Sequence, residues 1–348
     1  MTEEQIEKLS QDSVTETGEL SFDELCERLC EPGRTVILFH RSPDADAVGS
    51  AFALRMVLEE LGSEAFCLCE SEVPERLRFL MHGMQESVLP TALPTDFAPV
   101  RVVSVDSASP AQLGTLYSAY EKKIALAIDH HAKGERYAAQ SYVRAEAAAT
   151  GEILFDIVKE LATAEKIRIT EELCTNLYAA ISADTGCFRF SNVTPETHLR
   201  AAELLASGID CAEINHRLYE CKTMDQLRAE AAGISNLNLF CEGRVAVITF
   251  PYALKAALGL PDESMETLVD IARSLYGVEV AVCIRQPAAE GRFRVSTRSN
   301  GAYDVGALCA GFDGGGHAKA AGCTILAADI NEAMKRIVTA IRLPDEEE

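Results

Sequence analysis

The sequence predicts an α/β protein with a largely parallel sheet, followed by a second and smaller α/β domain. Short apolar runs typical of buried strands alternate with helical patterns up to residue 129, and this alternation indicates a parallel sheet. A second set of strand patterns begins only near residue 243, after a long helical region. With 348 residues, of which 48% are hydrophobic, the chain is long enough to form two hydrophobic cores.

Four strands are predicted in the first domain. Each is a short run rich in Val, Ile, Leu or Phe, and together they cover residues 35–40, 64–69, 100–106 and 124–129. A helix is predicted between the first two strands, at residues 47–61, because apolar residues recur there at helical spacing.

The region from about residue 150 to 220 is predicted to contain helices only. Its helical patterns cover residues 149–163, 171–184, 194–210 and 211–220. Strands are predicted again at residues 243–250, 278–286 and 292–299. We therefore expect an acidic tail at 1–20, a first domain at 21–222, a helical linker at 223–235, a second domain at 236–343 and an acidic tail at 344–348.

The charge balance restricts the partners that the protein can bind. Acidic residues outnumber basic ones by 54 to 32, which gives a formal net charge of −22. Such a surface repels long polyanions, because duplex binding depends on clustered Lys and Arg. Any nucleic acid substrate should therefore be short. The alternative, that the negative charge only keeps the protein soluble, explains the composition equally well.

The sequence indicates neither a membrane-spanning segment nor a framework of disulfide bonds. No apolar run approaches the length of a membrane span, and the start of the chain is too acidic and polar for a signal peptide, so a cytoplasmic protein without a membrane partner is expected. The twelve cysteines are scattered without a CxxC pair, and we expect them to be buried free thiols.

Titratable residues gather where predicted strands or helices end. Ligands of open α/β sheets bind beyond the carboxyl ends of the strands, and four stretches qualify there: "HRSPDADAVGS", "VDSAS", "DHHAKG" and "ADTG". The first also has a structural explanation, in which Asp46 caps a helix and Asp44 makes an Asx turn. In the second, Ser109 and Pro110 already supply a helix start, which leaves Asp106 as a ligand or as an incidental loop carboxylate.

The third and fourth stretches are harder to explain by packing. Asp129, His130 and His131 are three adjacent titratable residues after a strand that has a core composition. Asp184 follows a helical pattern, and a carboxylate at a helix C-terminus opposes the macrodipole. A structural role in packing remains the alternative for the third stretch, and a solvated carboxylate is the alternative for the fourth.

Together the four stretches offer a set of hard metal ligands. Four carboxylates in one cleft would repel one another, whereas two divalent cations would cancel their charge. Oxygen and imidazole donors without a thiolate favour manganese, with magnesium, iron or cobalt as competitors. The predicted ligands of this two-metal site are His40, Asp44, Asp46, Asp106, His130 and Asp184.

A cationic strand and a glycine triplet mark the second domain. In "RFRVSTRSN" the alternation places Phe293, Val295 and Thr297 on one face, and the other face carries Arg292, Arg294, Ser296 and Arg298. The glycines of "DGGGH" allow backbone N–H groups to approach a phosphate, with His317 beside them. A flexible turn is the alternative for the triplet.

These motifs resemble those of a known superfamily. The four stretches are similar, in order and spacing, to the motifs of the DHH phosphoesterases, and "STRSN…DVGALCAGFDGGGHAKAAG" resembles the DHHA1 domain that accompanies them. The resemblance spans about residues 20–340 and is greatest to the nanoRNase and 3'-phosphoadenosine-5'-phosphate (pAp) phosphatase group, the bifunctional oligoribonucleases. It implies a doubly wound DHH domain that faces a smaller DHHA1 domain, with the active site in the cleft between them.

The resemblance also implies a role for each residue. It assigns one metal ion to His40, Asp44 and Asp106, and the second to Asp46, Asp106, His130 and Asp184, so that Asp106 bridges the two. The catalytic residues would be Asp129, which orients a metal-binding imidazole, and His131, which contacts the scissile phosphate or assists proton transfer. The nucleotide would be held by Arg298, Ser299, Asn300 and the loop of Gly314, Gly315, Gly316 and His317.

The function expected is metal-assisted hydrolysis of a phosphoester in a short oligoribonucleotide, or in pAp. Two ions about 3.5 to 4 Å apart would share a hydroxide that attacks phosphorus in line with the leaving oxygen. A cyclic diadenylate phosphodiesterase would use the same motifs, and a nucleotide sensor without activity is the alternative of a different class. A RecJ-type exonuclease fits less well, because the chain lacks length for an OB-like domain and is acidic. The oligomeric state, a homodimer included, stays open.

Overall fold

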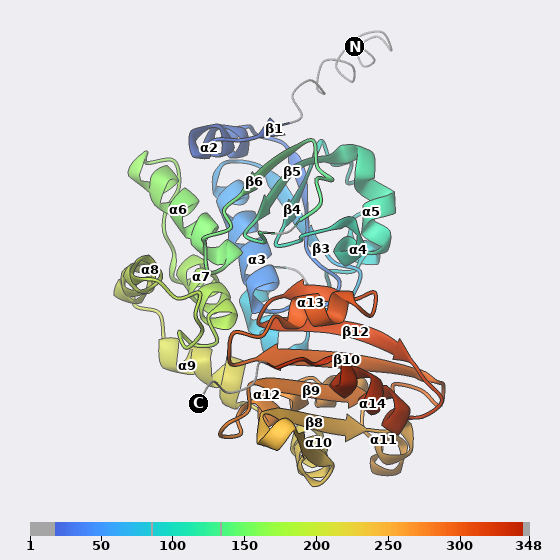
Figure 1. Ribbon diagram of the computed structural model, residues 1–348. Coiled ribbons are helices and arrows are strands. Elements are labelled where there is room, and N and C mark those ends of the chain that lie inside the picture. Colours follow the sequence, from blue (N-terminus) through green and yellow to red (C-terminus); the bar gives the residue numbers. More distant parts are fainter. Residues whose placement is uncertain (1–17, 85, 133, 344–348) are drawn as a thin grey trace. The chain divides into compact units, whose positions relative to one another are not determined.

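The computed structural model describes residues 18–84, 86–132 and 134–343, and the chain divides into two compact units (Figure 1). The first unit is Met1–Cys221 and the second is Lys222–Glu348. Of the predicted acidic tails, residues 1–17 and 344–348 lie outside the described residues. Within the described part of the chain, no helix combines the length and the apolar character needed to cross a membrane.

The first unit is built on a six-stranded sheet in which every strand pairing is parallel. The strands are β1 (Gly18–Glu19), β2 (Arg34–Leu38), β3 (Glu64–Leu68), β4 (Arg101–Val105), β5 (Ile124–Asp129) and β6 (Gln140–Val143). Their order is β1-β6-β5-β4-β2-β3. The chain passes from β2 to β3 on one side and then to β4 on the other, so a topological switch point lies between β2 and β4.

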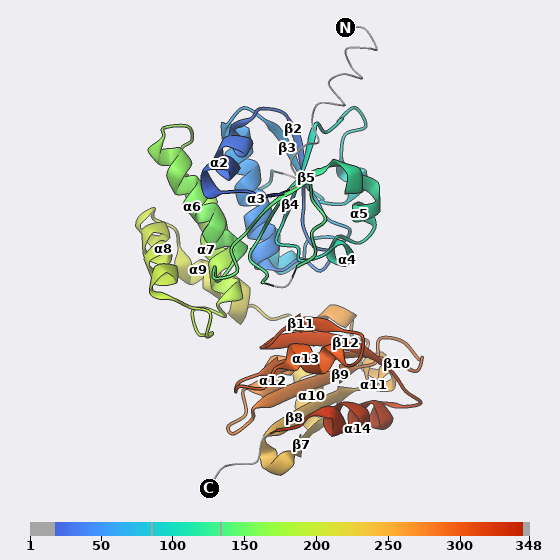
Figure 2. The ribbon, with the colours of Figure 1, turned by 45° about the horizontal axis from the view of Figure 1, so that its top comes forward.

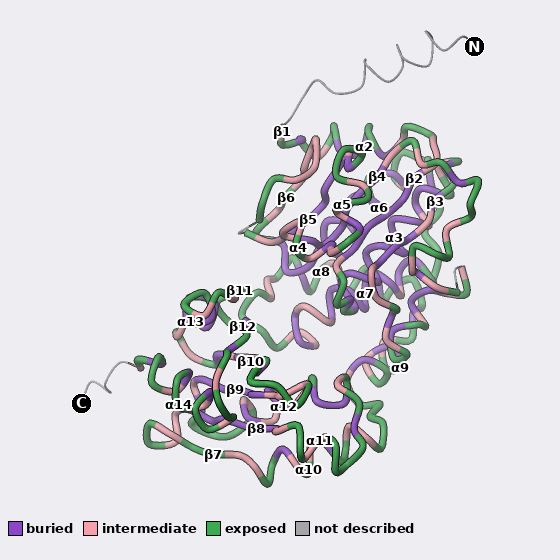
Figure 3. The backbone as a smooth tube through the Cα atoms, turned by 90° about the vertical axis from the view of Figure 1, so that its right-hand side faces the viewer, coloured by how far each residue is buried: buried purple, intermediate pink, exposed green. Residues whose placement is uncertain are grey.

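Helices cover both faces of this sheet (Figure 2). One face carries α2 (Phe22–Cys30), α3 (Ala45–Glu60), α6 (Thr150–Thr163) and α7 (Glu171–Asp184). The other face carries α4 (Pro110–Leu113) and α5 (Thr115–Tyr120). The strands between these layers are mostly buried (Figure 3). This arrangement confirms the doubly wound parallel fold.

The helical region that follows was predicted with small differences. Helices α6 and α7 are followed by α8 (Pro195–Ala206), α9 (Cys211–Asn215) and a π-helical turn at His216–Glu220. Short 3-10 turns connect other elements of this unit, at Glu75–Met81, Pro90–Ala92 and Glu121–Lys123.

The second unit has a mixed sheet of six strands. These are β7 (Leu237–Phe240), β8 (Val245–Phe250), β9 (Val280–Arg285), β10 (Arg292–Ser299), β11 (Gly315–His317) and β12 (Ala320–Leu326), in the order β11-β12-β10-β9-β8-β7. Among the strands in the described part of this unit, only β8 and β9 pair in parallel.

Helices cover both faces of the second sheet as well. One core contains residues of α13 (Val305–Ala310) and α14 (Ile330–Ala340), and the other contains residues of α10 (Met224–Ser235) and α12 (Leu268–Arg273). Helix α11 (Tyr252–Leu258) and 3-10 turns at Cys241–Gly243 and Asp262–Met265 complete the unit. The predicted helical linker is thus α10, which packs against α12 and β8 of the second unit.

Two local predictions need correction. Helix α3 begins two residues earlier than predicted, because Asp44 rather than Asp46 is its N-cap and accepts a hydrogen bond from the Ala47 backbone N–H. Residues Gly315–His317 form a strand rather than a loop, because they pair with Ala320–Gly322 of β12. The alternation predicted for β10 is confirmed, since Phe293, Val295 and Thr297 are buried while Arg292 and Arg294 are exposed.

The cysteines are all free thiols, as predicted, but only some of the twelve are buried. Seven are buried and three are partly buried, whereas Cys221 and Cys241 are exposed.

Candidate metal centre

The six predicted metal ligands come together at one edge of the first sheet. His40, Asp106 and His130 each follow one of the adjacent strands β2, β4 and β5, at the topological switch point. Asp46 lies in the first turn of α3 and Asp184 is the last residue of α7. Since the carboxyl ends of parallel strands share one edge of a sheet, the fold itself concentrates these side chains.

One group of potential ligands consists of His40, Asp44 and Asp106. The His40 Nε2 atom lies 3.6 Å from Asp44 Oδ2 and 3.5 Å from Asp106 Oδ2. Asp44 uses its other oxygen, Oδ1, to cap α3 at 3.0 Å from the Ala47 N atom. Asp44 can therefore cap the helix with one oxygen and belong to the group of potential ligands with the other.

A second group consists of Asp46, His130 and Asp184. The His130 Nε2 atom lies 3.2 Å from Asp184 Oδ2 and 4.0 Å from Asp46 Oδ2. The Nδ1 atom of the same ring lies 3.2 Å from the Ala147 carbonyl oxygen. Because a carbonyl only accepts, Nδ1 carries the proton and Nε2 is directed at the carboxylates, which is the arrangement of a metal-binding imidazole.

Asp106 joins the two groups. Its Oδ2 atom lies 3.5 Å from His40 Nε2, and its Oδ1 atom lies 3.7 Å from His130 Nε2. The side chain is almost completely buried, and the residue has a φ of 51°, in the left-handed region that aspartate tolerates better than most residues. The turn after β4 thus directs one oxygen of the same carboxylate to each group.

The electrostatics of the cluster favour cations. Burial raises the pKa of Asp184 to about 6, helped by the charges of Asp44 and Asp106. Burial also raises the pKa of Asp46 well above its usual value. Burial lowers the pKa of His130, but the hydrogen bond to Asp184 and the surrounding carboxylates outweigh it and raise this pKa to about 11. The imidazoles therefore serve as counter-charges for carboxylates that repel one another.

The donor chemistry fits divalent metal ions. The clustered atoms are carboxylate oxygens and imidazole nitrogens, which suit hard or borderline divalent cations. A third overlapping group is formed by Asp106, His130 and His131, and in each group the potential ligand atoms lie within 4.8 Å of one another. The acidic and histidine clusters of the first unit could therefore hold metal ions.

Asp129 orients the imidazole of His131. Its Oδ1 atom accepts a hydrogen bond of 2.6 Å from His131 Nδ1 and one of 2.8 Å from the His130 backbone N–H. The imidazole of His130 is oriented by Ala147 instead. Residues two apart along an extended chain point to the same side, which brings His131 to Asp129. The expected role of Asp129 in orienting a metal-binding imidazole stays a prediction.

The start of α6 contacts two of the predicted ligands, and sequence reasoning missed it. The Thr150 and Gly151 backbone N atoms donate to Asp46 at 2.7 and 2.9 Å, and the Thr150 hydroxyl donates to Asp106 Oδ1 at 3.1 Å. A nearby amide, that of Asn192, donates to the carbonyl oxygens of Ala148 and Asp184 at 3.0 Å each. The only sequence signal is that Thr150 and Gly151 stand at the start of a predicted helical pattern.

The residues predicted to bind the nucleotide lie in the second unit. Arg298 is partly exposed on β10, where its Nε atom lies 3.6 Å from Asp270 Oδ1. Strand β11 is exposed at Gly315, Gly316 and His317. The preceding residue, Gly314, is required for packing, because a Cβ there would lie 2.5 Å from the Cys323 Cβ.

Two further residues of the predicted set make local contacts. The Ser299 side chain is buried and its hydroxyl donates to the Gly301 carbonyl oxygen at 3.2 Å. The Asn300 amide donates to the carbonyl oxygens of Arg273 and Val278 at 2.8 and 2.9 Å. These bonds hold the turn after β10, and the part of Ser299 and Asn300 in substrate binding stays a prediction.

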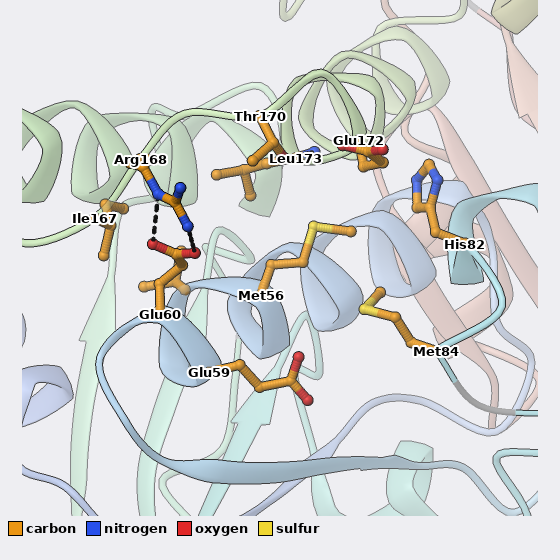
Figure 4. Close-up of a pocket in the computed structure, with 11 residues that line it drawn as sticks. Met56, Glu59, Glu60, His82, Met84, Ile167, Arg168, Thr170, Glu172 and Leu173 are labelled. Atoms are coloured by element: carbon orange, nitrogen blue, oxygen red, sulfur yellow. Dashed lines mark hydrogen bonds and ion pairs between the residues drawn. The ribbon is translucent and has the colours of Figure 1, made fainter.

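A hollow of about 390 Å³ lies elsewhere in the first unit, at the far ends of α3 and α7 from Asp46 and Asp184 (Figure 4). Met56, Met84 and Leu173 give it apolar walls, and Arg168 and Glu60 form an ion pair of 2.9 Å beside them. None of the predicted site residues lines this hollow.

Comparison with known proteins relates both units to described domains. The DHH family N-terminal domain matches residues 34–181, and the DHHA1 domain matches residues 245–342. The bifunctional oligoribonuclease and PAP phosphatase NrnA of Thermus thermophilus is 30% identical over 310 residues, which cover 89% of this chain and 90% of that protein. The cyclic-di-AMP phosphodiesterase GdpP of Bacillus subtilis is 23% identical and matches 91% of this chain but 49% of its own length.

A solved structure shares the fold. The crystal structure of an exopolyphosphatase-related protein from Bacteroides fragilis has a TM-score of 0.82 at 22% identity, and the match covers 92% of this chain and 94% of that one. With both domains matched and a relative 30% identical over nine tenths of its length, the chain belongs to the DHH family of phosphoesterases, hydrolases that act on phosphoester bonds.

Proposed function

We propose that this chain hydrolyses short oligoribonucleotides to mononucleotides with the aid of two divalent metal ions, preferably Mn²⁺, and that it also dephosphorylates pAp to AMP. The observation that carries the proposal is the position of Asp106, whose two carboxylate oxygens lie near His40 and His130 respectively. A carboxylate shared in this way suits a pair of cations. The substrate class is supported by the name of the relative from Thermus thermophilus.

Each cation would be held by its own group of side chains. His40, Asp44 and Asp106 would hold one ion, and Asp106 would share in the second site with Asp46, His130 and Asp184. When bound, two such ions lower the pKa of an attacking water molecule and neutralise charge on the phosphoryl oxygens. The clustered carboxylates, which repel one another in the protein alone, supply the affinity.

His131 and Asp129 would act together on the phosphate. The Asp129 carboxylate holds the Nδ1 atom of His131 at 2.6 Å, which fixes the orientation of the ring. Burial lowers the pKa of His131, but the hydrogen bond to Asp129 and the charges of Asp129 and Asp106 together outweigh burial and raise this pKa. A protonated His131 would donate a hydrogen bond to a phosphoryl oxygen or a proton to the leaving oxygen.

The second unit would select the nucleotide. Arg298 carries a guanidinium that suits a phosphate, and the exposed Gly315 and Gly316 of β11 offer backbone groups without side chains, next to His317. The acidic exterior of the protein would discourage long polyanions, which restricts the substrate to short lengths. A cytoplasmic location and a homodimer remain predictions.

Product analysis tests this function directly. Protein loaded with Mn²⁺ would be incubated with equal amounts of pApA, pAp and cyclic diadenylate, and the products separated by chromatography. We expect pApA to be converted first, to AMP, and His130→Ala to convert none of the three. Loss of pAp alone would restrict the function to a phosphatase.

A cyclic diadenylate phosphodiesterase is the second candidate. It is favoured by the relative GdpP, although this chain spans only about half of that protein. Preferential opening of the cyclic compound in the same assay would establish this alternative. Nucleotide binding without any turnover would instead indicate a sensor.

A further inference from the structure

We propose that Thr150 is a positioning residue, which holds the shared carboxylate of Asp106 and the carboxylate of Asp46 in the orientations that two metal ions require. This inference rests on the proposed two-metal hydrolysis. Thr150 is the first residue of α6 and its exposed fraction is 0%. No motif singled out in the sequence includes it.

Thr150 contacts both carboxylates through different groups. Its backbone N atom donates to Asp46 Oδ2 at 2.7 Å, and its hydroxyl donates to Asp106 Oδ1 at 3.1 Å. Asp46 and Asp106 belong to different elements, α3 and the end of β4. One residue therefore fixes the distance between two carboxylates that would otherwise repel each other.

The hydrogen bonds decide which oxygen of Asp46 is available to a cation. A carboxylate oxygen offers about two lone pairs. Asp46 Oδ1 accepts from the Ser50 hydroxyl at 3.0 Å and from the Gly151 N atom at 2.9 Å, so both of its lone pairs are used. Oδ2 accepts one bond, from Thr150, and lies 4.0 Å from His130 Nε2, so it retains a lone pair on the side of the cluster. Asp46 is thus arranged to bind through one oxygen.

The same reasoning applies to the shared carboxylate. The Thr150 hydroxyl occupies one lone pair of Asp106 Oδ1, and the same oxygen lies 3.7 Å from His130 Nε2. Oδ2, on the opposite side of the carboxyl group, faces His40. Without the hydroxyl, Asp106 could rotate and place both lone pairs of Oδ1 toward one group, which would weaken the bridge.

The surrounding segment holds Thr150 in place. The Ala147 carbonyl oxygen binds His130 Nδ1, and the Ala148 carbonyl oxygen accepts from Asn192. Gly151 allows α6 to approach α7, because a Cβ there would lie 2.6 Å from the Ala180 Cβ. The entry into α6 is therefore a rigid support for the site.

Substitutions that keep the size of the side chain isolate the hydroxyl. Thr150→Val removes the donor at nearly constant volume, and Thr150→Ser restores it. The matched control is Thr35→Val, at a fully buried threonine of β2 whose hydroxyl accepts from Arg101 Nε at 3.2 Å, on a strand of the same sheet and away from the cluster. Thr150→Ala replaces the valine variant if that variant does not fold.

The main readout is metal binding rather than turnover. Mn²⁺ would be titrated into each metal-free protein by calorimetry, and the paramagnetic resonance spectrum of the loaded protein would report whether two ions are coupled through a bridge. We expect Thr150→Val to lose about 10- to 100-fold in affinity for at least one ion and to weaken the coupled signal, as loss of a partner of metal ligands usually does. Turnover of pApA should fall through kcat rather than KM. Thr150→Ser should retain most of the affinity.

The controls distinguish failure of the positioning role of Thr150 from failure of the proposed two-metal function. Thr35→Val should unfold at lower denaturant concentration yet bind Mn²⁺ as the wild type does. If the wild type is active and binds two ions, but Thr150→Val binds both with unchanged affinity and coupling, the positioning role is refuted alone. A wild-type protein that binds no second ion would overturn the proposed function and this inference together.

Discussion

Replacement of Gly49 by alanine should disturb both the stability and the metal site of the first unit. Gly49 lies in α3, one turn after Asp46, and faces α7, the helix that ends with Asp184. A Cβ at this position would lie 2.6 Å from the Asn176 carbonyl oxygen and 3.2 Å from the Ala180 Cβ. Since the nearest atom is backbone, the helices must separate by a few tenths of an ångström.

The expected magnitudes follow from this contact. Overpacking of a buried site costs about 1 to 3 kcal/mol, and the better helix propensity of alanine offsets about 0.8 to 1 kcal/mol of it. The free energy of unfolding should therefore fall by about 1 kcal/mol. Because a misplacement of 1 Å can reduce a rate about 100-fold, a shift of a few tenths should lower kcat by about 3- to 10-fold.

Urea unfolding and pApA turnover would be measured on the same preparations. The control is Gly33→Ala, because a Cβ at Gly33 meets no atom within 4 Å and the position has no positive φ. This control should be neutral or slightly stabilising. Gly49→Ala with unchanged stability and unchanged kcat would show that α3 and α7 can accommodate a methyl group, and the reasoning about their contact would fail.

Three further outcomes are expected. Asp106→Asn should keep the left-handed backbone but reduce turnover by more than about 100-fold, because loss even of a residue that only supports a metal ligand reduces metal affinity or activity about 10- to 100-fold. Calorimetry with Mn²⁺ would measure the loss of metal binding. Arg298→Ala should raise the KM for pApA about 10-fold with little change in kcat, as loss of a charged hydrogen bond does, whereas Arg292→Ala on the exposed face of β10 should not. Asp156→Asn should destabilise the protein at pH 7, and urea unfolding should show this difference shrinking as the pH falls below about 4.

The sign of the last prediction follows from the contacts of Asp156. Burial raises the pKa of this carboxyl, but hydrogen bonds from Arg200 and Arg144 outweigh burial and lower it. A carboxyl with a lowered pKa in the folded state contributes stability above its unfolded value and loses it as the pH falls through the folded value. A difference in stability between wild type and Asp156→Asn that did not change with pH would contradict this assignment.

Unchanged metal affinity in Asp106→Asn would contradict the first of these predictions. An unchanged KM in Arg298→Ala would contradict the second.

Much of the first unit could be predicted because local patterns coincide with its elements. Strand β5 and helix α7 have the predicted bounds, since a buried strand and a long helix leave clear signals of period and composition. Strand β6 was missed because its sequence, QSYV, is largely polar and only partly buried. Strand β12 was missed because it contains two alanines and a glycine, which weaken a strand pattern.

The sequence predicted which residues are candidate metal ligands, but not the contacts that position their side chains. His40, Asp106 and His130 follow strands, and strand ends meet at one edge of a parallel sheet. The support from Thr150 could not be foreseen, because its contact with Asp46 joins residues 104 positions apart in the sequence. Nor could the choice of Asp44 over Asp46 as the cap be foreseen, because Asp46 accepts hydrogen bonds from the Thr150 and Gly151 backbone N atoms of α6 instead.

All six candidate metal ligands belong to the first unit, whereas the residues proposed to bind the nucleotide belong to the second. In evolutionary terms, this separation makes the two properties independently variable. Under the proposed assignment, substitutions around Arg298 and β11 would change the preferred nucleotide without altering the chemistry at Asp106, so that a single hydrolytic module would be retained while selection adapts its substrate.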